Sequence, residues 1–594
     1  MKKEINKINK TTSIPKNSRL LVYLLFFVIC ILIIFFNITK ISGEDDFFWH
    51  IASGRYIIDN QTIPSTDVFG FVTSGQQWIP FEWGWDVITF VIFNFFGFAG
   101  AYIFKILLIL SAFLIFYKIL DKFKINLSLK IFFLLFLCWG MLFRFSIRPH
   151  LISYIFFIVL IYIITLYKYS DRKSYKILYF LPAIFCVWAN FHMGVLTGIF
   201  LLSIFLLSEA IIFFLPQKFS TKEIPALSKK EILRLAAIYV LSLAALLINP
   251  NHINTYIYVF THTQSSLITE IGEWKSPFYS EYSSSPAMIT YKIFLASGIF
   301  IIYYSFRKKD LYAFLVFISF AIYSVRAARF TTDYNIICAI YIFLGINLLI
   351  ERIKSTKIKN FIYFSNSFKL ILIALILFQV VTVQNDNLFN EYFKYYRKWG
   401  IGPDRYFIPV GMMNFIKNTK INETGERPFN DYTCGGLFIW TFPGNKDFVD
   451  SRYVNDEIYN EYYTIENMQP GFTDKIKFYN MDYFMCVIPS MVNAPKGLSR
   501  NIAGYLSQNS NDWKLVYWDD ASLLFVKNIP KFDSIIAKYE YKYISPYNYI
   551  FNKRMIDRQF AENKESVLSE IRRKETEEPE GEIIGTISKT YPLR

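Results

Sequence analysis

The chain has 594 residues, is 54% hydrophobic and 19% aromatic, and carries a formal net charge of +16. A soluble chain of this length has shorter apolar runs, whereas here the runs recur at the length that crosses about 30 Å of hydrocarbon as a helix. The positive charge lies in short loops between these runs, a pattern that orients membrane proteins. The composition therefore predicts a polytopic α-helical membrane protein and argues against nucleic acid binding.

The apolar part of the chain ends near residue 384. Residues 1–19 are basic and polar and are expected on the cytoplasmic side. The apolar run that follows is too long for a signal peptide and lacks a small-residue cleavage site, so we expect it to remain as a membrane helix. The pattern predicts about eleven transmembrane helices, near residues 20–42, 99–119, 130–146, 149–167, 177–191, 194–215, 235–249, 288–305, 311–326, 334–350 and 369–384. Residues 88–98 are expected to lie along the interface or to extend the second helix.

The loops between these helices alternate in charge. Lys and Arg gather in residues 121–130, 168–176, 216–234, 307–309 and 352–369, whereas residues 43–87 and 250–287 each hold one basic residue. The positive-inside rule places the first group in the cytoplasm. Eleven helices from a cytoplasmic N-terminus then put everything after residue 384 outside.

Residues 385–553 are predicted to form an extracytoplasmic α/β domain, followed by a charged, solvated tail at 554–594. The segments PFNDY, KDFVDSR, MDYFMCVIP and WKLVYW are typical of strands, and PVGMMNFIKN, DEIYNEYYTIENM and LSRNIAGYLSQ are typical of helices. Cys434 and Cys486 could form one bridge in an oxidising compartment, but the sequence favours unpaired thiols. No cysteine pattern indicates a zinc site or a disulfide framework.

The first external loop, residues 43–87, concentrates acidic residues. It opens with Glu44, Asp45 and Asp46 and closes with Glu82 and Asp86 among three tryptophans. Acids that follow a membrane helix often serve only to solvate the interface. Three in a row before an aromatic-rich amphipathic helix are also compatible with a catalytic carboxylate. At helical spacing, Asp46 and His50 would share one face.

A second set of polar residues is expected at the external ends of later helices. It comprises Arg144, Arg148, His150, His192, Arg326 and Arg329. The arginines could extend toward lipid headgroups, and His192 could be a hydrogen-bonded helix-end histidine. Ionisable groups near hydrocarbon more often line a cavity. If the helices bundle, carboxylates would face arginines, an arrangement in which a carboxylate takes the proton of an acceptor hydroxyl and arginine stabilises a departing phosphate.

The segment EDDFFWHIASGRYIIDNQTIP resembles the first external loop of the GT-C class of integral membrane glycosyltransferases. The arrangement is similar to lipid-linked aminoarabinose transferases and protein O-mannosyltransferases. SIRPHLISY, VWANFHMG, LLINPNHINTYIY and FNDYTCGGLFIW…FVDSR resemble an uncharacterised bacterial branch of the same class. The resemblance implies an active site at the external membrane face, a polyprenyl-phosphate sugar as donor, and inversion at the anomeric carbon.

The same resemblance assigns roles to residues. Asp46 matches the catalytic base and Asp45 its partner, with Glu44 as the alternative register. The residues implied in substrate binding are Glu44, His50, Arg144, Arg148, His150, His192, Arg326 and Arg329. Some members of the class require a divalent metal, Mg or Mn, which Asp45 and Asp46 would hold here, and others do not. The chain lacks the WWDYG signature of oligosaccharyltransferase catalytic subunits, which disfavours transfer of a whole oligosaccharide to asparagine.

The predicted function is therefore a hexosyl or pentosyl transferase of the bacterial inner membrane that acts in the cell envelope. Its acceptor would be an extracytoplasmic lipid, polysaccharide or protein. One alternative is an O-antigen-ligase-like transferase, which would need a large external loop between late helices. Another is a non-enzymatic transporter or envelope assembly protein. Transporters often show internal repeats and broken helices at the membrane midplane, and neither is evident in the sequence.

Overall fold

The structure is a computed structural model that describes residues 16–592, except 43–45, 170–174, 216–223, 263–270, 280–283, 393–395, 453 and 490. Glu44 and Asp45 therefore lie outside the described residues. The chain divides into two compact units. In their described parts, unit 1 holds residues 16–39, 95–262 and 271–401, and unit 2 holds residues 40–94 and 402–592.

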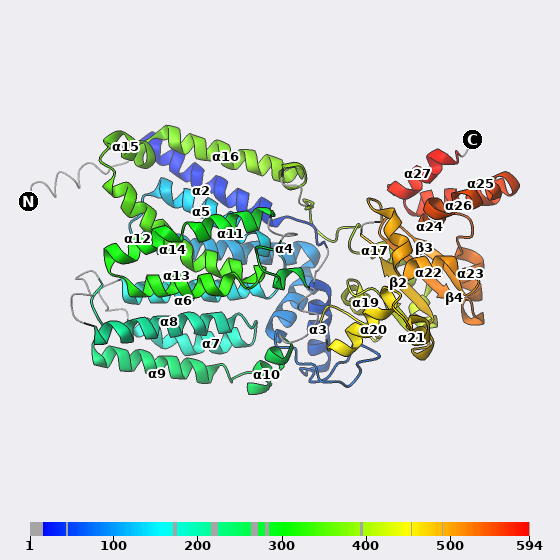
Figure 1. Cartoon of the computed structure of the whole chain (residues 1–594), viewed down its shortest axis with the longest axis horizontal. Helices are drawn as coiled ribbons and strands as arrows, with labels where there is room; N and C mark the ends of the chain where they lie inside the picture. Colours follow the sequence, from blue (N-terminus) through cyan, green and yellow to red (C-terminus); the bar gives the residue numbers. More distant parts are fainter. Residues whose placement is uncertain are drawn as a thin grey trace, which may run out of the picture. The chain divides into compact units, whose positions relative to one another are not determined.

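Unit 1 is a helical bundle (Figure 1). α2 (Lys16–Asn37) packs beside α16 (Asn366–Gln384), and α14 (Thr331–Arg352) packs against both α12 (Gly298–Lys308) and α13 (Leu311–Ser324). Most side chains of α14 are buried, which makes it the central helix of this unit. The other helices are α5 (Leu127–Met141), α6 (His150–Lys168), α7 (Leu181–Ala189), α8 (Val195–Phe214), α9 (Lys229–Ala245), α10 (Ile253–His262), α11 (Pro286–Ala296) and α15 (Thr356–Phe364).

Seven helices in the described part of the chain are long and apolar enough to cross a membrane. They are Leu20–Asn37, Trp83–Lys122, His150–Lys168, Val195–Phe214, Pro286–Lys308, Ala328–Arg352 and Asn366–Gln384. The other four predicted spans correspond to shorter helices, three of them apolar, whereas α9 begins with three charged residues and a capping box at Ser228. The protein is thus an integral membrane protein by its helices, while the count of eleven and the orientation of the loops stay predictions.

A break at Gly97 divides α4 (Trp83–Lys122) into two helical parts. Gly97 has φ 57° and ψ −152°, a conformation that residues with a Cβ atom rarely adopt. Of the two expectations for residues 88–98, extension of the second predicted helix is therefore the one observed. A kink at Gly97 separates most of this stretch from the rest of the helix. The boundary between the units, at Asn94 and Phe95, falls just before this break.

Unit 2 is built around a four-stranded sheet of order β1-β2-β4-β3, with β1 (Pro428–Asn430), β2 (Tyr483–Val487), β3 (Trp513–Trp518) and β4 (Ser522–Lys527). β1 and β2 are parallel, in register Pro428 with Tyr483, and the other pairs are antiparallel. Three predicted strands are confirmed. KDFVDSR is not a strand, because two of its charged side chains turn into a buried ion pair, and β4 was not predicted.

Short helices surround this sheet. α17 (Val410–Thr419), α20 (Asp456–Glu466) and α22 (Ile502–Gln508) confirm the three predicted helices in position. The remaining ones before residue 530 are α18 (Ile421–Thr424), α19 (Gly435–Thr441) and α21 (Phe472–Phe478). Cys434 and Cys486 are both buried free thiols.

The charged tail packs into the core of unit 2, so the expectation of a solvated arm was wrong. It forms most of α25 (Lys553–Glu562), together with α26 (Lys564–Glu577) and α27 (Glu582–Thr590), and follows α23 (Asp533–Tyr539) and α24 (Pro546–Phe551). Ile556, Ile571 and Ile587 are fully buried in the same cluster as Phe484 of the sheet. The carboxylate of Glu570 also accepts hydrogen bonds from three consecutive backbone N–H groups, at 542–544.

The first external loop is part of unit 2. Its helix α3 (Phe47–Asn60) packs on α19 so closely that a Cβ atom on Gly436 would lie 3.1 Å from the Trp49 nitrogen. Arg55 donates hydrogen bonds to the carbonyls of Ile439 and Trp440, both at 3.0 Å. The first half of α3 is buried on all sides, from Phe47 to Gly54, rather than on one face as an amphipathic helix would be.

Candidate functional site

Asp46 lies directly before α3, at the helix N-terminus. A carboxylate in this position interacts favourably with the positive end of the helix dipole, although the Asp46 side chain makes no capping hydrogen bond. The Asp46 carbonyl also accepts the first helical hydrogen bond, from the His50 nitrogen at 3.1 Å. The local sequence therefore fixes Asp46 and His50 one turn apart, as the spacing predicted.

His50 is held by a buried carboxylate from α4. Its Nδ1 lies 2.6 Å from Oδ1 of Asp86, and the hydroxyl of Ser53 donates to the other Asp86 oxygen at 2.7 Å. Gly54 allows this approach, because a Cβ atom there would lie 2.1 Å from the Asp86 carbonyl oxygen. The hydrogen bond to Asp86 places a proton on Nδ1 of His50 and fixes the ring.

The other ring nitrogen of His50, Nε2, is buried and has no hydrogen-bond partner among the described residues. A carboxylate oxygen of Glu82 lies 3.9 Å from it. Burial lowers the pKa of the His50 imidazole, but the carboxylates of Asp86, Glu82 and Asp46 together outweigh burial and raise that pKa above its ordinary value. The N-terminus of α3 therefore combines Asp46 with a histidine that is favoured in its cationic form.

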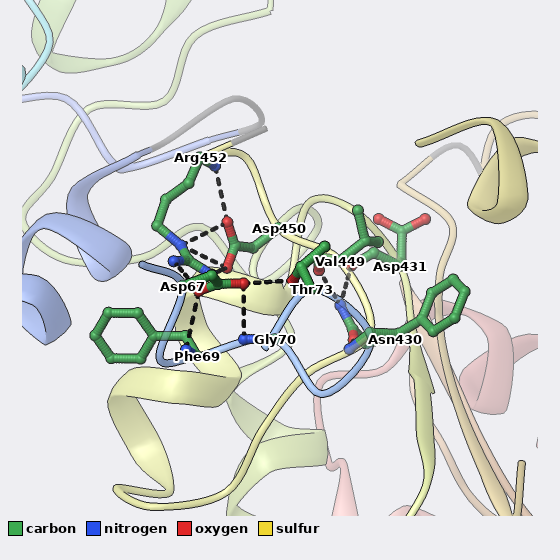
Figure 2. Close-up of polar contacts among 10 residues, drawn as sticks. Asp67, Phe69, Gly70, Thr73, Asn430, Asp431, Val449, Asp450 and Arg452 are labelled. Carbon is green, nitrogen blue, oxygen red and sulfur yellow. Dashed lines mark hydrogen bonds and ion pairs between the residues drawn. The ribbon is translucent and has the colours of Figure 1, made fainter. Parts of the chain in front are cut away.

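A second charged group in unit 2 surrounds Arg452 (Figure 2). Arg452 donates to both oxygens of Asp450, at 2.6–2.9 Å, and to Asp67 at 2.7 Å. The guanidinium also lies 4.7 Å from the ring centres of Phe69 and Trp78. Burial raises the pKa of Asp67, but Arg452 and the hydrogen bonds to this carboxylate lower it more, so the net pKa is below its ordinary value. We call Arg452, Asp67, Asp450 and the adjacent Asp447 the Arg452 cluster.

The Arg452 cluster connects the first external loop to the sheet. Asn430, at the end of β1, donates to the Val449 carbonyl at 2.6 Å and accepts from the Phe448 nitrogen at 2.8 Å (Figure 2). Asp431 accepts from the nitrogen and hydroxyl of Thr433 and caps the next turn. The hydrogen bonds of Asn430, Asp431 and Arg452 thus join segments within unit 2.

In unit 1, three arginines converge on one glutamate. Arg144 forms a short ion pair with Glu273, Arg148 Nη1 lies 3.8 Å from the same carboxylate oxygen, and Arg329 Nη1 lies 3.4 Å from the other. Burial raises the pKa of the Glu273 carboxyl, but the three arginines hold it well below its ordinary value. The guanidinium of Arg329 also lies 4.2 Å over the ring of Trp274. We call Arg144, Arg148, Arg329 and Glu273 the arginine cluster.

Two histidines with fixed tautomers accompany this cluster. Nε2 of His150 donates to the Arg144 carbonyl at 2.8 Å, so its Nδ1 accepts from the Arg144 guanidinium at 3.2 Å. Nδ1 of His192 accepts from the Gly194 nitrogen at 2.9 Å and from the Ser153 hydroxyl at 2.7 Å, which leaves the proton on Nε2. The two imidazole rings are 6.5 Å apart.

The structure thus gathers Arg144, Arg148, His150 and Arg329, as the positions at helix ends suggested. Arg326 is exposed, and no ion pair joins it to the arginine cluster among the described residues. Asp46 and His50 belong to unit 2 and the arginines to unit 1, so that these groups meet in one pocket stays a prediction. The sequence analysis did not single out Glu273, although it predicted that the loop at 250–287, which holds this residue, is external. It also did not predict the pairing of His50 with Asp86.

A divalent metal has no complete set of ligands in the part of the chain that the structure describes. No three His, Cys, Asp or Glu side chains there are spaced to hold an ion. Of the two carboxylates implied as ligands, Asp46 is described and Asp45 is not. The metal requirement therefore stays a prediction, and the chemistry below uses protein groups.

The fold is similar to solved structures of the oligosaccharyltransferase from Archaeoglobus fulgidus, a GT-C glycosyltransferase. The crystal structure of its apo form aligns with a TM-score of 0.51 over 79% of this chain and 70% of that chain, at 12% identity. AglB in complex with an inhibitory peptide and a dolichol-phosphate aligns with a TM-score of 0.52 over 86% of this chain and 75% of that chain, at 10% identity.

These matches show that the chain has the GT-C fold. They do not support the aminoarabinose or O-mannosyl transferase subgroup to which the sequence was also compared, since the similar structures belong to an oligosaccharyltransferase. No family model matches the sequence. The search of curated proteins also gives no match.

Proposed function

We propose that this protein is a membrane glycosyltransferase that moves a sugar from a polyprenyl-phosphate donor to an extracytoplasmic acceptor. The GT-C fold supports the class, and the two polar groups described above supply the chemistry that such a transfer needs. The observation that carries the proposal is the convergence of three arginines on one carboxylate in unit 1. Three guanidinium groups that already contact one anionic group suit a phosphate.

The arginine cluster is the proposed site for the donor phosphate. Arginine binds phosphate through two parallel, charge-assisted hydrogen bonds, and its charge is permanent. The hydrogen bonds of His150 hold Arg144 in place, and His192 carries its proton on Nε2, where it can serve as a donor to a phosphate oxygen. Arg148 and Arg329 complete the binding site, and Arg326 is proposed to contribute from its rim.

Asp46 is the proposed base, with Asp45 as its partner and Glu44 as the alternative. It removes the proton from the acceptor hydroxyl, whose oxygen attacks the anomeric carbon on the face opposite the phosphate. The bond from that carbon to the phosphate oxygen breaks, and polyprenyl phosphate leaves with the electron pair. Because the departing phosphate gains one negative charge, arginine stabilises the transition state more than the bound donor. The configuration inverts.

Replacement of the base tests this assignment. Asp46→Asn keeps the size of the side chain and removes its basicity, so transfer should fall roughly 10²–10⁴-fold. The measurement is transfer of labelled sugar from a polyprenyl-phosphate donor to envelope acceptors by the purified protein in detergent. Asp59→Asn, an exposed acid at the end of the same helix, is the matched control and should retain activity. Wild-type rates for Asp46→Asn would refute the role of Asp46.

A second candidate is transfer of a lipid-linked oligosaccharide to a peptide. It is favoured by the similar structure of AglB, which was solved with a dolichol-phosphate and an inhibitory peptide. The absence of WWDYG in this sequence argues against it. The mass of the product separates the two, because the first reaction adds one sugar and the second adds a complete oligosaccharide to an asparagine.

A further inference from the structure

We propose that Glu273 occupies the position of the donor phosphate in the arginine cluster, and that the donor binds only when this carboxylate leaves. The inference rests on the proposed function, because it takes the cluster as the phosphate site. It gives Glu273 a role as an internal competitor that determines how strongly a phosphate-bearing lipid binds.

The geometry of the ion pairs supports this role. One oxygen of Glu273 faces Arg144 and Arg148 and the other faces Arg329, so both are used. The phosphodiester of the donor presents two non-bridging oxygens, as a carboxylate does, and these can accept hydrogen bonds from the same guanidinium groups. A carboxylate and a phosphate cannot fill that position together, so one must displace the other.

The charge balance favours the exchange. Three guanidinium groups contact one carboxylate, and the carboxylate of Asp333 acts electrostatically on Arg144 and Arg329. Among the described residues, these three guanidinium groups face two acids, Glu273 and Asp333. Positive groups held so close together are costly without an anion between them. Glu273 supplies one negative charge, the phosphodiester of the donor supplies the same, and the phosphate monoester that departs after transfer supplies up to two.

The segment that carries Glu273 is fixed by contacts other than these ion pairs. Glu273 lies in the short helix η5 (Gly272–Trp274). The residues that follow η5 form hydrogen bonds with η6 (Ala328–Phe330) and with the residues just before it. The Ala328 nitrogen donates to the Lys275 carbonyl at 2.8 Å, and the Ser276 hydroxyl donates to the Val325 carbonyl at 3.0 Å. The side chain of Glu273 can therefore rotate away without release of its backbone.

The degree of exposure is consistent with such a movement. The side chain of Glu273 is 13% exposed, Arg144 is 7% exposed and Arg329 is 23% exposed. The cluster is thus closed at Arg144 and open at Arg329. Of these side chains Arg329 is the most exposed, so we expect the carboxylate to leave and the phosphate to enter on the side of Arg329.

The test measures binding rather than transfer. The full-length protein in detergent is titrated calorimetrically with a short-chain polyprenyl monophosphate as the probe. If Glu273 fills the site about nine-tenths of the time, its removal should tighten apparent binding about tenfold. We expect this gain for Glu273→Gln. Glu351→Gln is the matched control. Arg329 lies just before the start of α14 and Glu351 lies near its end, so this variant should bind the probe as the wild type does.

Two outcomes overturn the inference in different ways. If Glu273→Gln binds the probe as the wild type does or more weakly, the carboxylate holds the arginines together and does not compete. If Arg144→Gln binds the probe with unchanged affinity, the cluster is not a phosphate site, and the proposed donor role fails with it. Should Glu273→Gln not fold, Glu273→Asp keeps the charge but shortens its reach. It should bind between twofold and tenfold tighter, and wild-type or weaker binding by it is equally decisive against competition.

Discussion

The Arg452 cluster and the arginine cluster have opposite charge ratios. In unit 2, one guanidinium donates to Asp450 and Asp67 and lies near Asp447, so acids outnumber arginine. In unit 1, three guanidinium groups share one carboxylate, Glu273. The first group is satisfied by its own acids. The second has more guanidinium groups than carboxylates among the described residues.

The two clusters also differ in access to solvent. The side chain of Arg452 is 1% exposed and lies between two aromatic rings, whereas Arg329 is 23% exposed. A buried, fully hydrogen-bonded ion pair constrains how segments pack, because removal of one partner strands the other. A partly open group with excess charge is suited to a ligand of opposite sign. Charge ratio and access together separate a structural arginine from a binding one.

Loss of Arg452 should have the largest effect on stability. Arg452→Gln leaves Asp67 and Asp450 buried without their cation, which costs about 3–5 kcal/mol for a broken buried pair. Thermal unfolding in detergent should therefore show a clear decrease in the midpoint of the transition. Arg500→Gln, at an exposed position of the same unit, should leave the midpoint unchanged. Equal midpoints for both variants would mean that the Arg452 cluster does not stabilise the fold.

Loss of Arg144 should affect transfer instead. Arg144→Gln removes the most buried donor of the proposed phosphate site, and loss of one such donor slows catalysis roughly 10²–10³-fold. The rate should fall while the thermal midpoint changes little, the reverse of the pattern for Arg452. The control is Arg352→Gln, which replaces an exposed arginine at the last residue of α14. A midpoint that fell as far as that of Arg452→Gln would make the two clusters alike and remove the contrast.

The sequence allowed the local part of this site to be predicted. Asp46 and His50 are one helical turn apart in the sequence. The hydrophobic runs predicted that Arg144, Arg148 and Arg329 lie at the external ends of helices. Such features follow from periodicity and from loop charge, which are readable without a structure. The arginine convergence was expected in outline, but not its centre at Glu273.

The partners that are distant in sequence could not be predicted. His50 is paired with Asp86 across 36 positions, and Arg452 with Asp67 across 385. No local pattern connects such residues, because packing of the whole unit decides which acid a cation meets. The tail was misread for a related reason. Its charges dominate the composition, while Ile584 and Ile587, three positions apart, are buried in the core.

The smallest predicted effect concerns Asp447, whose two carboxylate oxygens are buried and have no hydrogen-bond partner among the described residues. Burial and the neighbouring Asp450 raise the pKa of Asp447 well above its ordinary value, so the folded protein favours the neutral acid. That contribution to stability is full below the ordinary carboxyl pKa of the unfolded chain and is lost as pH rises through the raised pKa. Asp447→Asn stays neutral at every pH. Its free energy of unfolding should therefore exceed that of the wild type by a margin that grows from pH 5 to pH 8 by on the order of 1 kcal/mol, which thermal unfolding at each pH measures. A margin that is constant with pH would show that Asp447 ionises in the folded protein as freely as in the unfolded chain.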